Sequence, residues 1–392
     1  MATELMKQLA DKKDSVEAFM ETLEKGAELV AETMGEMVPV FSIAAPVVKL
    51  ALDNIESKEA EFMKEQFQKL RDRLEVVSEE IQRINQEIQK SGADAAYFSV
   101  EENLSNQFRK FMDILNAKPK FREVKTKLFL EHFAKTGGDK NLHTLYAAVT
   151  GENFSGESVL EITLNYEEKS RRAVEDFCAR LKNLFCLGLI ALVGHAGLKG
   201  TDEEEELLRD WGEKIKVVEE KMKAVVEVCK SGFAEQAELD IGKRLKGWNS
   251  KTHTELADAI AELLAQKYDW VSWAVRVYAR TEGWLGNLIY GKKDQGIYGG
   301  NHFAFEGQLR VVVSYSLNPS SIDGDSLRRL IEGQRRTRNM EKLALWIHSA
   351  QPHCLVHVVS KRRDVAERTS NFPDDFRYYQ LYRNSHIYIH SE

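Results

Sequence analysis

Residues 63–88, MKEQFQKLRDRLEVVSEEIQRINQEI, carry the clearest pattern in this sequence. Apolar residues recur there at alternating steps of four and three, and lysine, arginine, glutamate and glutamine fill most positions between them. This alternation is typical of the apolar seam of a coiled coil. It predicts one long helix whose apolar face packs against other helices. The seam consists of Met63, Phe67, Leu70, Leu74, Val77, Ile81, Ile84 and Ile88.

Three further segments carry the same kind of pattern. Residues 208–229 repeat the alternation and follow Thr201-x-x-Glu204, a capping box that satisfies free amides at a helix start. Residues 174–184 extend a third seam, and residues 9–37 form a looser one. Four seams in one chain favour an intramolecular bundle over a lone dimeric coiled coil. The positions of these seams are Leu208, Trp211, Ile215, Val218, Met222, Val225, Cys229, Val174, Phe177, Leu181, Leu184, Leu9, Val16, Phe19, Leu23, Val30 and Met37.

The residue types change after Asp269. Before that position, shorter segments with helical spacing are predicted to be further helices of the bundle. After it, β-branched and aromatic residues dominate, as in strands. The predicted helices cover residues 101–115, 121–134, 142–149 and 255–266, and the predicted strands cover residues 273–279, 309–315, 354–360 and 383–390.

Residues 325–338 are predicted to form a helix within this C-terminal part, with Asp323 or Asp325 as its cap. We expect the strands at residues 309–315 and 354–360 to belong to one sheet, on which this helix packs. The residues predicted to face the sheet are Leu327, Leu330 and Ile331.

The predicted fold class is mainly α. Residues 1–269 are expected to form an elongated helical bundle with long coiled-coil helices, laid out like the α-pore-forming toxins. Residues 270–392 are expected to form a small α+β domain. The length of 392 residues exceeds the size at which single hydrophobic cores stop growing. A hydrophobic share of 43%, a charged share of 30% and only 6 prolines argue against a disordered or fibrous chain.

The cysteines and the N-terminus indicate a cytoplasmic protein. The 4 cysteines are far apart and lack a C-x-x-C pair, so the sequence suggests neither a disulfide framework nor a zinc site. The first residues, MATELMKQLADKKDSVEAFM, are charged throughout and lack the apolar stretch of a secretory signal. We therefore expect a protein that is not secreted by a signal peptide, and that is peripheral to membranes if it meets them.

Two apolar segments are expected at turns between long helices. Residues 37–48, MVPVFSIAAPVV, and residues 183–198, NLFCLGLIALVGHAGL, carry no acidic residue, lysine or arginine. A membrane-spanning helix needs about 20 apolar residues, so neither is convincing as a span. Small residues recur at steps of three in the second segment, which allows another helix to approach closely. These small residues are Gly188, Ala191, Gly194, Gly197 and Gly200.

These apolar segments allow two interpretations. In one, they are buried crossings inside the bundle. In the other, they form a concealed apolar head that swings out to meet lipid, helped by the low helix propensity of glycine. The predicted membrane-engaging residues are Phe185, Leu187, Leu189, Ile190, Leu192, Val193, Val40, Phe41 and Ile43.

No motif indicates catalysis, a cofactor or a metal. In residues 194–201, GHAGLKGT, Gly200 separates Lys199 from Thr201, which excludes a phosphate loop. No segment supplies a nucleophile, a base and an orienting group. A cluster of arginines suits anionic lipid, although a solvated helix face is the ordinary interpretation. This cluster is Arg328, Arg329, Arg335, Arg336 and Arg338.

The chain resembles the fish rapunzel proteins and their cephalotoxin-like relatives. The resemblance rests on GEMVPVFSIAAPVVKLAL (residues 35–52) leading into ESKEAEFMKEQFQKLRDRLEVVSEEI (residues 56–81). It extends to YDWVSWAVRVY (residues 268–278) and CLVHVVS (residues 354–360). It implies a role in fin and skeletal development without enzymatic activity.

The leading expectation is therefore a non-enzymatic intracellular protein whose helical bundle engages membranes. The alternative is a soluble scaffold or signalling protein whose apolar segments stay buried. Expected partners are an anionic lipid membrane, a second copy of the chain or other proteins. We expect neither nucleic acid nor a small-molecule substrate.

Overall fold

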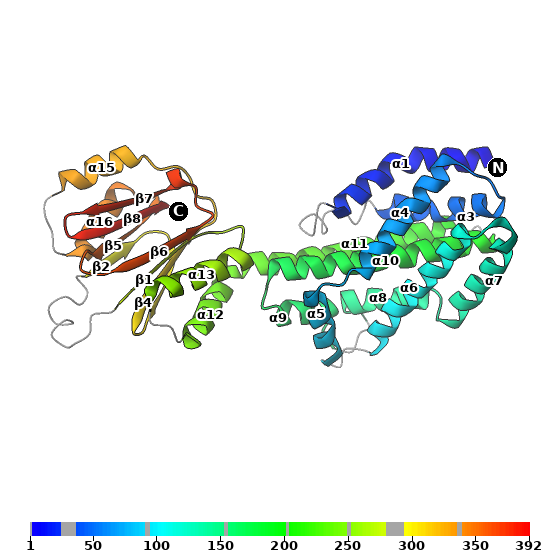
Figure 1. The fold of residues 1–392 in the computed structure, drawn as a ribbon, viewed down its shortest axis with the longest axis horizontal. Helices are drawn as coiled ribbons and strands as arrows, with labels where there is room; N and C mark the ends of the chain where they lie inside the picture. Colours follow the sequence, from blue (N-terminus) through cyan, green and yellow to red (C-terminus); the bar gives the residue numbers. More distant parts are fainter. Residues whose placement is uncertain are drawn as a thin grey trace. The chain divides into compact units, whose positions relative to one another are not determined.

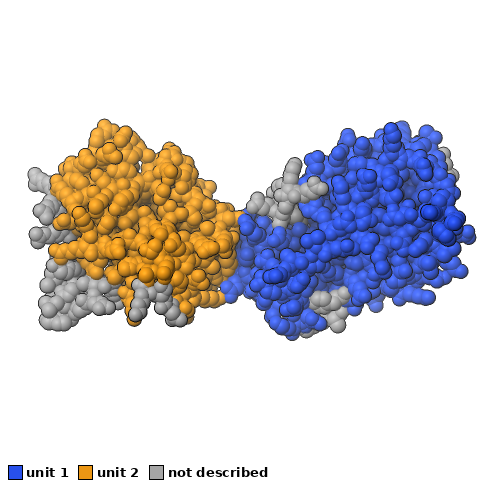
Figure 2. Space-filling model, viewed as in Figure 1, with its two compact units in different colours: residues 1–232 blue, residues 233–392 orange. Residues whose placement is uncertain are grey.

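The computed structural model describes residues 2–24, 37–90, 95–152, 156–200, 204–248, 252–279, 294–334 and 339–392. The chain divides into two compact units, Met1–Gly232 (unit 1) and Phe233–Glu392 (unit 2), which are coloured separately in Figure 2. The helices of unit 1 are α1 (Ala2–Glu24), α2 (Met37–Ser42), α3 (Ala44–Leu52), α4 (Lys58–Glu75), α5 (Glu79–Lys90), α6 (Ala95–Asn116), α7 (Pro119–Lys135), α8 (Lys140–Thr150), α9 (Val159–Tyr166), α10 (Arg171–Lys199) and α11 (Glu204–Ser231).

Unit 1 is arranged around α10. This helix packs against α2, α3, α4, α6, α8, α9 and α11, and most of its residues are buried. Figure 1 shows α10 and α11 side by side, with α7 at the edge of the unit. Because neighbours surround it, the second half of α10 is apolar around most of its circumference and not only along one stripe.

The long helix predicted over residues 63–88 is in fact two helices, α4 and α5. The chain is extended at Val76, whose side chain is 78% exposed, and the hydroxyl of Ser78 accepts a hydrogen bond from the amide of Ile81 at 3.2 Å. A β-branched residue followed by a serine cap favours a new helix start over continuation. The seam residues on both sides of the break are nevertheless buried, with Val77 partly so.

The other seams are confirmed as buried helix faces. In α11 the seam residues are buried, except that Val226 replaces Val225 as the deeper residue and Leu208 is partly buried. The seam of α10 and the four positions of the seam in α1 are buried as well. Val30, Thr201 and the side chain of Met37 lie outside the described residues.

Glycines let other helices approach α10 closely. A Cβ atom added to Gly194 would lie 2.3 Å from the ring of Phe111 in α6, and one added to Gly197 would lie 2.7 Å from Cβ of Ala45 in α3. The rings of Phe67 and Phe129 lie 6.3 and 5.9 Å from the Phe111 ring, centre to centre, so the Phe111 ring can move only by disturbing them. Each of these glycines therefore leaves room for a side chain of a neighbouring helix, and α10 continues through them without a break.

Unit 2 begins with two helices and continues as a mixture of strands and helices. Its elements are α12 (Phe233–Lys246), α13 (His253–Lys267), β1 (Ser272–Ala279), β2 (Gln295–Tyr298), β3 (Asn301–Glu306), β4 (Leu309–Ser316), α15 (Gly324–Gly333), α16 (Met340–Ala350), β5 (Cys354–Ser360), β6 (Val365–Ser370), the short helix η4 (Asp374–Phe376), β7 (Arg377–Tyr382) and β8 (Ser385–Ser391).

The strands of unit 2 form two antiparallel sheets. Their orders are β3-β4-β1-β6 in the first sheet and β2-β5-β8-β7 in the second. Apolar residues of α12 and α13 cover one face of the first sheet, and those of α15 and α16 cover one face of the second. A cluster of Tyr278, Val312, Val359 and Tyr388 joins the two remaining faces. Unit 2 thus has four layers, with the sheets in the middle (Figure 1).

The second half of unit 2 repeats the topology of the first. The first half consists of α12, α13 and β1–β4, and the second half of α15, α16 and β5–β8. Matched in this order, the two sheets have the same strand order. Each sheet contains one strand from the other half, β6 in the first sheet and β2 in the second. The register agrees too. Arg276 of β1 lies opposite Glu367 of β6, and His357, at the matching place in β5, lies opposite Ile297 of β2.

Two features of unit 2 differ from expectation. The unit begins at Phe233 and not near Asp269, because the apolar faces of α12 and α13 cover the first sheet. The strands predicted to share one sheet lie in different sheets, β4 in the first and β5 in the second. As predicted, α15 packs on a sheet through buried Leu327 and Ile331, with Leu330 partly buried.

We expect a fragment of residues 233–392 to unfold cooperatively on heating and a fragment of residues 270–392 to aggregate. The shorter fragment lacks α12 and α13, and it would expose the buried side chains of Trp273, Val275 and Val277. Circular dichroism during heating checks this. A cooperative transition of the shorter fragment at the same temperature would contradict it.

We expect Gly194→Ala to lower the free energy of unfolding by about 1–3 kcal/mol, since the new methyl group must displace Phe111. Gly242→Ala in α12 is the matched control. No atom lies within 4 Å of a Cβ added there, so alanine should stabilise its helix by about 0.5–1 kcal/mol. Urea unfolding of both variants tests the pair, and equal effects would refute the close approach at Gly194.

Candidate functional site

The two apolar segments of the sequence lie together in the core of unit 1. Residues 183–198 form the second half of α10, and α2 and α3, which contain most of the other segment, pack against that helix. Within the described residues, α10 is the one helix long and apolar enough to cross a membrane, and 89% of its apolar window is buried. All nine predicted membrane-engaging residues are at most 5% exposed: Phe185, Leu187, Leu189, Ile190, Leu192, Val193, Val40, Phe41 and Ile43.

The expectation that residues 183–198 form a separate turn between helices is wrong. The segment continues the third seam without a break, and α10 ends at Gly200, which has a left-handed backbone with φ of 66°. The glycines did not end the helix earlier, because α3 and α6 fill the space beside them. The apolar half of α10 is thus an integral part of a long helix.

Polar groups fix the middle of α10 to the end of α4. The side-chain amide of Asn183 donates to the carbonyl oxygen of Leu70 at 3.0 Å, and the guanidinium of Arg180 donates to that of Leu74 at 3.3 Å. The carbonyl groups of the last helical turn lack partners within the helix, so Arg180 stabilises the end of α4 at Leu74, and Asn183 adds a second contact one turn earlier. Arg180 also pairs with Glu101 of α6.

A buried lysine lies directly before the apolar half of α10. Lys182 is 0% exposed, and its Nζ atom lies 5.5 Å from the centre of the Phe19 ring in α1. An ammonium group over an aromatic face is stabilised by the ring quadrupole, which offsets part of the loss of hydration. Arg180, Lys182 and Asn183 thus mark the boundary within α10. The first half of the helix is polar, and within the described residues the second half lacks such polar contacts to neighbouring helices.

The far end of α10 is covered mainly by apolar contacts. Ala45 of α3 lies against Gly197. One ion pair joins α3 to the start of α11, with 2.7 Å between Nζ of Lys49 and Oε1 of Glu204. The two side chains are 37% and 24% exposed, and such partly hydrated pairs contribute only about 0–1 kcal/mol. The apolar half of α10 is therefore covered by α3 through apolar packing, with one partly hydrated ion pair between α3 and α11.

The predicted basic cluster lies partly on α15. Arg328 and Arg329 are exposed, and Arg329 donates to the carbonyl oxygen of Asp325 and the hydroxyl of Ser326 in its own helix. Arg335, Arg336 and Arg338 lie outside the described residues. An anionic surface at this cluster remains a prediction.

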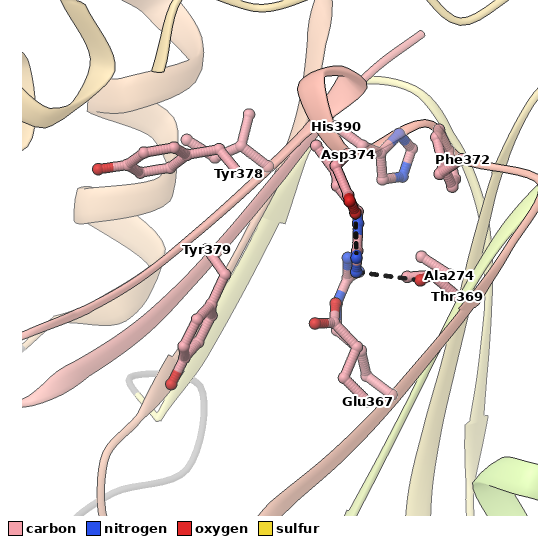
Figure 3. A pocket seen from close by; sticks show the side chains of 11 residues that line it. Ala274, Glu367, Thr369, Phe372, Asp374, Tyr378, Tyr379 and His390 are labelled. Atoms are coloured by element: carbon pink, nitrogen blue, oxygen red, sulfur yellow. Dashed lines mark hydrogen bonds and ion pairs between the residues drawn. The ribbon is translucent and has the colours of Figure 1, made fainter. Parts of the chain in front are cut away.

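A cavity of about 260 Å³ opens between the sheets of unit 2, beside β6 and β7 (Figure 3). Two arginines line it, and each has a carboxylate partner. Nε of Arg276 donates to Glu367 at 2.9 Å, and Arg377 donates to Asp374 at 2.8 Å. Arg276 is only 1% exposed. The charges of these arginines are thus balanced within the protein.

His390 in the same cavity is fixed as a neutral ring. Its Nδ1 lies 2.8 Å from the carbonyl oxygen of Ser391 and so carries the proton, while Nε2 accepts from the hydroxyl of Ser314 at 2.8 Å. Burial and then the charge of Arg276 lower its pKa to about 3. The lowered pKa makes His390 a weak base, and Ser314 is 0% exposed, so this buried pair does not favour general-base catalysis.

The thiols are not activated either. All four cysteines are buried, and burial raises the pKa of Cys186 to about 12 and that of Cys354 to about 11. A nucleophilic cysteine needs a lowered pKa and access to substrate. Across the described ranges, no three histidine, cysteine, aspartate or glutamate side chains form a group that could hold a metal.

Sequence reasoning missed the buried charges Lys182 and Arg276. A signal for Arg276 exists, because it is the single charged residue in the strand SWAVRVYA. A strand that is apolar at nearly every position is covered on both faces, so a charge within it must be buried. For Lys182, the helical spacing alone gave no such signal.

Comparison with known proteins agrees with this architecture. A family model described as the cephalotoxin-like middle helical domain matches residues 53–251. Protein rapunzel of Danio rerio is 33% identical over 193 residues, which cover 49% of this chain and 85% of that protein. No solved structure matches. The chain therefore belongs to the rapunzel/cephalotoxin-like family.

Proposed function

We propose that this chain is a non-enzymatic protein of the rapunzel type that acts in fin and skeletal development, and that its helical unit engages anionic membranes from the cytoplasm. The similarity to Protein rapunzel supports the first part. The balanced charges of the cavity in unit 2 and the buried thiols favour a role without catalysis.

The observation that carries the membrane proposal is the construction of α10. Its apolar window has the length and composition of a membrane-spanning helix, and it lies under α3, which is apolar as well. A helix satisfies its own backbone hydrogen bonds, so it can pass from a protein core to lipid. Core and lipid are similarly apolar, and the balance between them then depends on the contacts that α2 and α3 lose.

The rival proposal is a scaffold or signalling protein in which α10 never leaves the core. The close contacts at Gly188, Gly194 and Gly197 favour it, because such specific packing is typical of a permanent core. In that case the partners are proteins.

Acid is a suitable trigger for exposure of α10. The ring of His195 in α10 stacks on Phe133 of α7, with 4.2 Å between their centres. Burial, followed by the charge of Lys199, lowers the pKa of His195 to about 4, and Asp139 opposes the shift. An unfolded histidine titrates near about pH 6.5. Between these values the unfolded chain binds a proton that the folded chain does not, so stability falls as the pH falls.

We expect Lys49→Ala to increase the fraction of protein that stays on vesicles of phosphatidylcholine and phosphatidylserine after a wash in concentrated salt. Loss of a pair that contributes about 0–1 kcal/mol should raise this fraction by up to about fivefold. Lys64→Ala is the control, because Lys64 pairs with Glu61 within α4 and joins no other helix. Flotation measures the fraction. If neither wild type nor Lys49→Ala leaves salt-resistant protein on the vesicles, the scaffold proposal replaces this one.

We expect His195→Phe to reduce the loss of stability on acidification. Between pH 7 and pH 5, wild type should lose about 1 kcal/mol more of its free energy of unfolding than the variant, a value reduced from the full shift because His195 is only half-buried. Urea unfolding of the whole chain at both pH values tests this. Equal pH dependence of the two proteins would exclude His195 as the sensor.

A further inference from the structure

The outer face of α7 carries an apolar stripe in contact with solvent. Phe121, Val124 and Leu128 are 51%, 59% and 46% exposed. They follow one another at steps of three and four, so they lie on one side of the helix. Exposed apolar residues are common singly, but three in a row on one helix face indicate a surface that meets a partner.

The opposite face of α7 is fixed to the core. Phe129 and Phe133 are buried, and their rings lie 5.8 Å apart, centre to centre. Phe129 also contacts Phe111 of α6, and Phe133 contacts His195 of α10. The helix is therefore held in one orientation, and its outer stripe cannot turn inward.

Lysines surround the exposed stripe. Residues 118–135 contain six lysine or arginine residues and two glutamates, whereas the whole chain has a net charge of −7. The exposed members lie at both ends and beside the stripe, and Nζ of Lys120 lies 4.8 Å from the centre of the Phe121 ring. Burial, and then the charges of Lys110 and Arg109 in α6, lower the pKa of His132. The exposed lysines are Lys118, Lys120, Lys127 and Lys135.

A hollow of about 490 Å³ continues this surface from α7 toward α3. Leu52 and Leu130 contribute apolar walls. Arg122 and Lys127 contribute positive charge, and Glu123 and Glu131 contribute negative charge. Arg122 is itself fixed, since it donates to the side chain of Asn54 at 2.8 Å. The surface that includes the stripe thus reaches the helix that covers the apolar half of α10.

We propose that the outer face of α7 docks on the surface of an anionic lipid bilayer. This inference deepens the membrane function proposed above and rests on it. Phe121, Val124 and Leu128 enter the interface between headgroups and acyl chains, and the lysines contact the headgroups. Apolar residues between lysines are typical of helices that lie in a membrane interface, where long side chains keep their charge in water.

A bilayer fits this surface better than a protein partner does. A stable protein interface buries about 800 Å² on each side, which is far more than three half-exposed side chains supply. Weak and reversible membrane binding needs less apolar area when basic residues add attraction to anionic lipid. An acidic partner protein or a second copy of the chain is the outcome to be excluded.

The test measures binding of the full chain to vesicles of phosphatidylcholine with phosphatidylserine and to vesicles of phosphatidylcholine alone. One variant combines Phe121→Ser, Val124→Ser and Leu128→Ser, and another combines Lys120→Glu and Lys127→Glu. Both should bind the anionic vesicles about tenfold or more weakly than wild type. Thermal melts of both should match wild type, because all five side chains are exposed.

Matched controls distinguish the effect of this surface on vesicle binding from the general effects of exposed apolar area and net charge. Leu239→Ser removes an exposed leucine of α12 that is 59% exposed. Lys216→Glu with Lys230→Glu makes the same change in charge on exposed positions of α11. Both controls should bind the anionic vesicles like wild type.

Several results would overturn the inference. If the α7 variants bind vesicles as strongly as wild type, another surface meets the membrane. If wild type binds both kinds of vesicle equally, anionic lipid has no role. Concentration-dependent self-association that the α7 variants abolish, without vesicle binding, would identify a second copy as the occupant. If wild type binds anionic vesicles and salt removes all of it, docking at α7 stands and the proposed exposure of α10 fails.

Discussion

The architecture of unit 1 depends on the contact between Gly194 of α10 and the aromatic ring of Phe111. That ring lies where Gly194 has no side chain, and Phe67 of α4 and Phe129 of α7 hold it on either side. Four helices therefore meet at one residue. Because interiors are close-packed, a shift of one of these four helices alone would open a void or cause a clash, and this contact therefore fixes the spacing of α4, α6, α7 and α10.

Different interactions hold the two halves of α10, and this difference determines at which end of the helix the bundle opens more easily. Hydrogen bonds and a buried ammonium group fix the first half to α1, α4 and α6, and breaking them would leave polar groups unsatisfied in the core. The second half is held by dispersion and apolar burial, which a bilayer can replace. If the bundle opens, the end of α10 near Gly200, on the side that α3 covers, is where fewest polar contacts must break.

An apolar stripe indicates burial, and for that reason most helices of unit 1 could be predicted from the sequence. The break between α4 and α5 could not be predicted in this way. Leu74 and Ile81 keep the seam spacing across the break, so the apolar pattern does not show it. The nearly continuous apolar residues of β4 and β5 show that these strands are buried but not which sheet contains them. At the site, the apolar residues could be identified, but core and lipid favour the same residue types, and the covering helix α3 lies far away in the sequence.

The repeat within unit 2 has a consequence for the continuity of its chain. Residues 317–323 connect β4 to α15 and are the link between the two halves, yet each sheet contains one strand from the other half. Neither half can complete its own sheet, since β1 would lack β6 and β5 would lack β2. If the two halves were made as separate chains that end and begin at this link, they would therefore need to fold together. After a cut at the link in the folded protein, the exchanged strands would hold the two pieces together as a heterodimer.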